Sequence, residues 1–137
     1  MKGLDSLIRL HKWRLDEKKR EITALQNFAG RLKKERERLV LDFEQEKAVA
    51  TASPEAGMTF EAYARHVRKR LAKLDGSVVQ VVEKLEMARE DLAEAFQEVK
   101  RYEITRDSRE RRAQERQRRL ETEEMDEIGG HRFRRRI

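Results

Sequence analysis

The sequence predicts an all-α fold in which two long helices form an antiparallel coiled-coil hairpin and the second helix overhangs the first. Three observations predict it. Only 37% of the residues are hydrophobic and 44% are charged, which is too few apolar side chains to fill a thick core. The single proline, Pro54, separates two long stretches that contain none. The third observation is an uncharged seam with alternating steps of four and three residues: Phe60, Ala64, Val67, Leu71, Leu74, Val78, Val81, Leu85, Ala88, Leu92, Ala95, Val99 and Tyr102.

The first helix is predicted over residues 4–47. The same stepping from Leu4 to Phe43 gives a weaker seam, in which three positions are polar. Those three residues are His11, Lys18 and Arg36, whose long or amphipathic side chains can carry their polar ends to the edge of the interface. The internal Gly30 costs only about 1 kcal/mol relative to alanine. One long helix is therefore expected here.

Residues 48–59 are predicted to form the loop at the tip of the hairpin. Pro54 and Gly57 interrupt the heptad pattern there, and the segment carries almost no charge. A short helical turn is possible after Ser53, which would cap a helix with proline at its first position. Thr59 is the expected N-cap of the second helix.

The second helix is predicted over residues 60–128, with Gly129 and Gly130 ending it before a basic tail, residues 129–137. If Lys47 lies opposite Phe60, the numbers of paired residues in an antiparallel pair add to about 107, so Leu4 lies opposite residue 103. The apolar seam also ends at Tyr102. Residues 103–128 are therefore expected to extend beyond the first helix, and the first helix is the expected partner of the seam.

Several function classes lack support in the sequence. There is no cysteine, which excludes disulfides and thiolate metal sites and is compatible with the cytoplasm. No stretch approaches the length of about 20 apolar residues that a membrane span needs. The three histidines are far apart, and no catalytic or phosphate-binding motif occurs. We therefore expect a soluble binding protein with no enzymatic activity, no cofactor and no metal.

The charges and the apolar residues outside the seam indicate protein contacts. The formal net charge of +6 arises at the two ends of the chain. Because basic residues are interleaved with acidic ones and aromatic residues are few, no nucleic acid is expected as a partner. Trp13 and Ile104 fall on outward positions near the open end and are candidate contacts. Met58, Phe60 and Tyr63 cluster at the tip, where they either close the hairpin or bind a partner.

Two terminal patterns make the chain resemble the FliJ family of flagellar protein-export proteins. They are DSLIRLHKWRLDEKKREI, at Asp5 to Ile22, and MDEIGGHR, at Met125 to Arg132. The resemblance implies a stalk or coupling subunit of the type III export apparatus, cytoplasmic and peripheral to the inner membrane through its partners. The implied partners are the hexameric export ATPase, the cytoplasmic region of the export gate and substrate chaperones.

The resemblance also implies which residues make these contacts. Those expected to bind the ATPase lie near the two helix ends: Asp5, Leu7, Ile8, Arg9, Lys12, Arg116, Arg119, Leu120, Asp126, Glu127 and Ile128. Those expected to contact the export gate lie early in the second helix: Phe60, Tyr63 and Val67. Three alternatives remain open: an injectisome stalk protein, a structural adaptor that dimerises through the overhang, and a nucleic-acid-binding protein.

Overall fold

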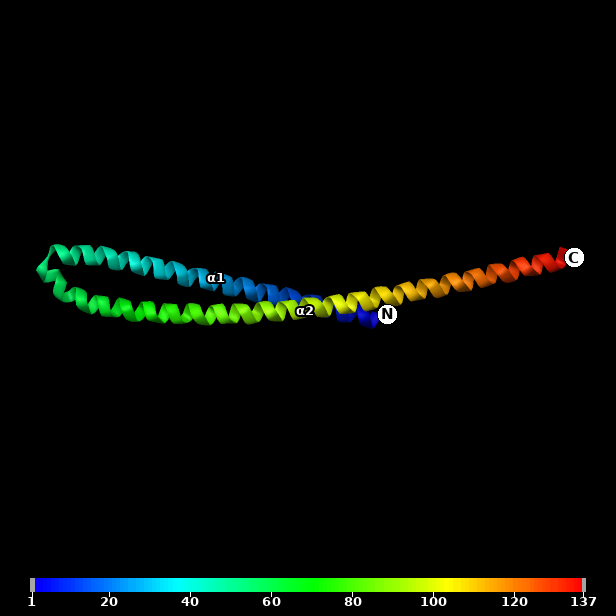
Figure 1. The fold of residues 1–137 in the computed structure, drawn as a ribbon, viewed down its shortest axis with the longest axis horizontal. Helices are drawn as coiled ribbons and strands as arrows, with labels where there is room; N and C mark the ends of the chain where they lie inside the picture. The colour runs from blue at the N-terminus through cyan, green and yellow to red at the C-terminus, as the bar shows by residue number, and fades with distance from the viewer. Residues whose placement is uncertain (1, 137) are drawn as a thin grey trace. The chain divides into compact units, whose positions relative to one another are not determined.

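The computed structural model describes residues 2–136, which form two helices, α1 (Lys2–Ala52) and α2 (Pro54–Arg136). The predicted all-α class is confirmed, and no strand occurs within the described part of the chain. The chain divides into two compact units. Unit 1 combines Met1–Arg14 with Ala95–Ile137, and unit 2 is Leu15–Glu94. In each unit a segment of α1 lies beside a segment of α2 (Figure 1).

The core of unit 2 is the predicted seam. Its buried residues are Ile22 and Leu32 from α1 and Leu74, Val81, Leu85 and Ala88 from α2. Leu25, Ala29, Leu39, Val78 and Leu92 pack against them and are partly buried. Every one of these residues occupies a position of the two predicted seams. The prediction that α1 is the partner of the α2 seam is therefore confirmed in this unit.

Ion pairs flank this core and follow the expected antiparallel register. Arg36 Nε lies 2.8 Å from Asp75 Oδ1, and Arg70 pairs with Glu35. These pairs depart from the predicted register by about one helical turn at most. All four side chains are about half exposed, so each pair adds little to the free energy of folding. Apolar burial supplies most of the stability, and the ion pairs favour one alignment of the helices over others.

The tip differs from the loop predicted over residues 48–59. Helix α1 continues to Ala52 and α2 begins at Pro54, so Ser53 alone separates them. Proline fits the first helical position because its missing N–H would have no partner there. The Gly57 N–H donates to the Ser53 carbonyl at 3.3 Å, which closes the first turn of α2. Thr59 lies inside α2 and donates its hydroxyl to the Ala56 carbonyl, so the prediction that it caps the helix was wrong.

The end of α2 also differs from the prediction. Helix α2 continues through Gly129 and Gly130 to Arg136, so the predicted tail is helical as far as the structure describes it. Glycine ends a helix by adopting a positive φ, and neither glycine does so here. Each glycine costs the helix only about 1 kcal/mol relative to alanine. That cost does not by itself end a helix whose neighbouring residues favour it.

Gly76 gives a test of the continuous helix in unit 2. A Cβ built at this position meets no atom within 4 Å, so the Gly76→Ala substitution needs no rearrangement. We expect it to raise the free energy of unfolding by about 1 kcal/mol, because alanine loses less backbone entropy in a helix. Urea unfolding followed by circular dichroism measures the change. The exposed Ala72→Gly should produce a loss of similar size, and a destabilised Gly76→Ala variant would contradict a regular helix at this position.

Candidate protein-interaction surfaces

In unit 1, the segments of α1 and α2 are held together around His11. The imidazole stacks on the Tyr102 ring, with 4.8 Å between the ring centroids and 29° between the planes. His11 Nδ1 lies 3.3 Å from Glu98 Oε2, and Ile8 and Val99 are buried in the same unit. His11 is itself buried, although it was one of the three polar positions of the predicted seam. It is accommodated because its ring packs on an aromatic face and its nitrogen meets a carboxylate.

The packing between the two segments of unit 1 ends a few residues beyond Tyr102. Lys12 Nζ lies 3.8 Å from Glu103 Oε1, and Glu103, Arg106 and Ser108 are half-buried. From Arg109 to Arg134 every residue is exposed. We call residues 109–136 the free helix. In unit 1, α2 continues past the N-terminal segment as this single helix (Figure 1). The predicted overhang is therefore present and begins about one and a half turns later than residue 103.

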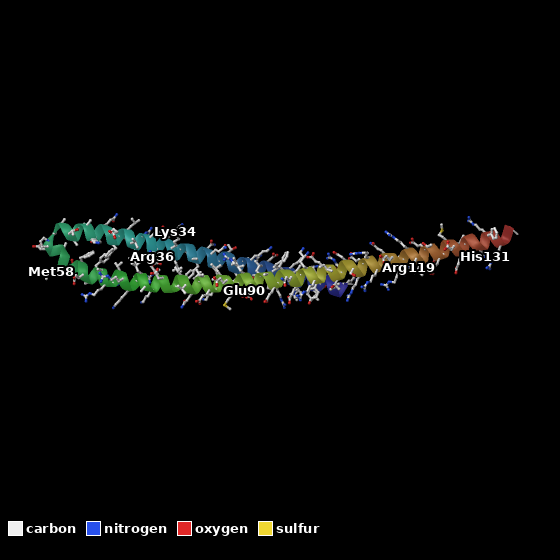
Figure 2. The ribbon with its side chains drawn as sticks, viewed as in Figure 1. Lys34, Arg36, Met58, Glu90, Arg119 and His131 are labelled. Atoms are coloured by element: carbon white, nitrogen blue, oxygen red, sulfur yellow. The ribbon has the colours of Figure 1, made fainter. Side chains whose placement is uncertain are left out.

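Four large apolar residues are exposed on the free helix: Leu120, Met125, Ile128 and Phe133. At about 100° per residue, they lie at about 0°, 140°, 80° and 220° around the helix axis. They therefore cover more than half of its circumference and do not form one stripe. Arg119 and His131 also project from this helix (Figure 2). The resemblance pointed to Leu120 and Ile128 and not to Met125, which lies in the same predicted helix. Phe133 joins them because α2 continues through the predicted tail.

The residues expected to bind the ATPase all belong to unit 1, but they differ in accessibility. Ile8 is only 3% exposed and is a core residue, so it is not available to a partner. Asp5 and Leu7 are half-buried, and Arg9 and Lys12 are exposed. The members on α2 are all exposed on the free helix: Arg116, Arg119, Leu120, Asp126, Glu127 and Ile128. The accessible part of this set is therefore concentrated on α2.

Trp13 and Ile104 behave as the sequence predicted. Both belong to unit 1, and both are exposed. Neither can be assigned to the core of that unit, which is formed by Ile8, His11 and Val99. Exposed large apolar side chains among charged neighbours remain candidates for contact with a partner.

The tip, in unit 2, carries a cluster of three aromatic rings. Phe43 lies 5.5 Å from Phe60 and 6.5 Å from Tyr63, and Phe60 lies 6.2 Å from Tyr63, measured between centroids. Phe60 and Tyr63 are half-buried, whereas Val67 is 1% exposed and belongs to the core. The sequence placed Phe43 on the seam of the first helix. It did not predict the contacts of Phe43 with Phe60 and Tyr63, because these depend on where the chain turns between the two helices. The cluster therefore closes the helix pair and also reaches the surface.

A shallow groove lies beside these rings. It is lined by Glu46, Val49, Ala50, Ala56, Thr59, Phe60 and Tyr63. Val49 and Met58 are exposed nearby, and Met58 is 85% exposed at the end of the hairpin (Figure 2). The groove is mainly apolar, so it suits contact with a protein better than capture of a charged ligand.

Over residues 2–136, no group of three histidine, aspartate or glutamate side chains is arranged to hold a metal ion. Neither helix, within the same residues, has a stretch long and apolar enough to cross a membrane.

The family model described as Flagellar FliJ protein matches residues 1–137, the whole chain. No curated protein and no solved structure matches the chain. The match therefore covers α1 and the whole of α2, including the free helix.

Tyr102 tests how unit 1 is held together. The Tyr102→Ala substitution removes the ring on which His11 stacks, so residues 4–14 should open from α2 more often. Hydrogen exchange measured by mass spectrometry should become at least threefold faster in that segment, while residues 22–88 keep their protection. Trp13→Ala is the matched control, because this ring is exposed, and it should leave the exchange unchanged. Equal effects of the two substitutions would contradict the stacking role.

Proposed function

Because the chain belongs to the FliJ family, as the match over its whole length shows, we propose that it is the coupling subunit of a flagellar export apparatus. Family membership makes it a protein associated with flagellar type III export. Within that role, we propose that the free helix binds the ring of the export ATPase and that the tip contacts the cytoplasmic region of the export gate. The protein would act by binding and not as an enzyme.

The exposure of the free helix on all sides is the observation that carries this proposal. A helix that binds a flat or grooved surface normally concentrates its apolar residues in one stripe about 100° wide. Here Leu120, Met125, Ile128 and Phe133 are distributed over more than half of the circumference. A ring that encloses the helix can contact all four residues at once. The geometry therefore favours an enclosing partner over a one-sided one.

An enclosing partner would also stabilise the free helix more than it would stabilise a helix that is already packed. Isolated helices are marginally stable in water, because most of the stability of protein helices comes from packing of an apolar face. From Arg109 to Arg134, α2 has no such packing. Insertion into a ring would supply the missing contacts, and it would leave the core of unit 2 unchanged.

The tip is proposed as the contact with the export gate. Phe60 and Tyr63 reach the surface beside an apolar groove, and the exposed Val49 and Met58 extend the apolar area. Val67 would act indirectly, by holding α2 against α1 in the core. Binding to the gate would bring the protein to the inner membrane through its partner. Substrate chaperones are proposed as further partners on the strength of family membership.

Truncation after Ser108 tests the proposal. This cut removes the free helix and keeps the half-buried residues that pack against α1. We expect the affinity for the purified export ATPase to fall at least tenfold, measured by biolayer interferometry, because the enclosed contacts are lost. Circular dichroism should show that the remaining helices are retained. Undiminished binding would contradict the proposal.

A variant of the tip serves as the matched control. Met58→Glu adds a charge at an exposed position, so it should leave both the fold and the binding of the ATPase unchanged. The same variant should weaken binding to the isolated cytoplasmic region of the gate. If Met58→Glu binds this region as the unmodified protein does, the proposed role of the tip is wrong.

A further inference from the structure

The charges of the free helix and of the turn before it are sorted into three bands along the axis. The first basic band, residues 106–119, contains seven arginines and three acidic residues. The acidic band, residues 121–127, contains five acidic residues and no basic one. The second basic band, residues 132–136, contains four arginines and no acidic residue. The charge of this segment is therefore ordered along the helix and not evenly mixed.

From Arg109 to Arg134, these charges form no ion pair with one another or with α1 in the structure. Along α2, the last ion pair in the described residues joins Arg106 to Asp107. Glu124 and Asp126 have no basic residue three or four positions away, which is the spacing that brings helical side chains together. Glu123 has Arg119 four positions before it, but acidic residues at both of its C-terminal neighbouring positions, Asp126 and Glu127. Like charges at this spacing destabilise a helix, so the acidic band would be relieved by a cationic partner.

The choice of basic residue points to recognition by geometry as well as charge. From residue 101 onward the chain has twelve arginines and no lysine, whereas the first hundred residues have eleven lysines and ten arginines. The guanidinium group binds a carboxylate through two parallel hydrogen bonds, and arginine is enriched in protein interfaces while lysine is depleted. The two basic bands are therefore suited to carboxylates of a partner protein.

We propose that the free helix and the turn before it bind a partner surface, here called the wall, that carries three complementary bands along the helix axis. Its acidic bands face the two basic bands of the helix, and its basic band faces the acidic band. The inference rests on the proposed function, which makes this wall the inside of the ATPase ring. At about 1.5 Å per residue, the centres of the three bands are separated by about 17 Å and about 15 Å. Both distances exceed the Debye length of about 8 Å at physiological salt, so the partner senses each band separately.

The order of the bands gives the contact an axial position and a direction. Sliding the helix by one band would place like charges opposite each other, and such juxtaposition disfavours wrong arrangements. A nucleic acid or an anionic membrane offers negative charge along its whole surface. Either would repel the acidic band. The banding therefore favours a protein with alternating charge.

A swap of charges between bands tests the proposal without changing the composition. The variant combines Arg116→Glu and Arg119→Glu with Glu123→Arg and Glu127→Arg, so its net charge equals that of the unmodified protein. All four positions are exposed, and the helix content should be unchanged by circular dichroism. We expect the affinity for the purified export ATPase to fall at least tenfold. The fall in affinity with added salt should also become less steep.

The control keeps the bands and every arginine in place. It combines Glu123→Asp with Glu127→Asp, and it should bind within about threefold of the unmodified protein on electrostatic grounds. If the swapped variant loses helix content, the pair Glu123→Arg and Glu127→Arg alone provides a second test, with the same expected loss of affinity.

The outcomes separate this inference from the proposed function. If truncation after Ser108 abolishes binding while the folded swap variant binds normally, the band order is irrelevant and the inference is overturned, although the proposed function stands. If the truncated protein binds normally, both are overturned. Submicromolar binding of the unmodified protein to random duplex DNA at physiological salt would also overturn the inference, because a uniform polyanion would then satisfy the helix.

Discussion

Burial of one narrow apolar seam against another is the interaction on which the paired parts of this chain depend. Each fully buried leucine, isoleucine or valine contributes roughly 1.5–3 kcal/mol, whereas each exposed ion pair contributes at most about 1 kcal/mol. In unit 2 the buried side chains of the core all come from the two seams. In unit 1 the seam is shorter and includes His11, which is held by Tyr102 and Glu98. The ion pairs then select the alignment of helices that are already packed.

The end of the seam has a functional consequence. From Arg109 to Arg134 the helix has no apolar support, and its charges and scattered apolar residues face solvent on every side. A helix of this kind adds little to the stability of the fold. It offers instead a surface that a partner can enclose. The order of its charge bands differs along the axis, so a complementary partner would favour one axial position of the helix over others. The proposed binding surface is therefore the part of the chain that contributes least to its own core.

The seam was predictable because apolar residues in a paired helix repeat with a fixed period, and each core residue of unit 2 was identified in advance. The ends of the helices were not. Gly57 was expected to lie in a loop, and Gly129 and Gly130 were expected to end the second helix, whereas α2 continues through all three and none adopts a positive φ. Ile8 and Val67 were expected to touch partners, yet their seam positions bury them. The basic tail was identified, but the order of the three charge bands was not, because a heptad search looks for residues seven apart and not for blocks.

Hydrogen exchange along α2 of the protein alone tests the central claim most directly, because it shows where packing against α1 ends. The account predicts slow exchange of backbone amides from residue 64 to about residue 102, followed by a steep rise in exchange rate that is complete by Ala113. It also predicts that the rate is the same at low and high protein concentration. Uniform protection from residue 64 to residue 130 in a monomeric sample would contradict the claim that the free helix has no packing partner within its own chain.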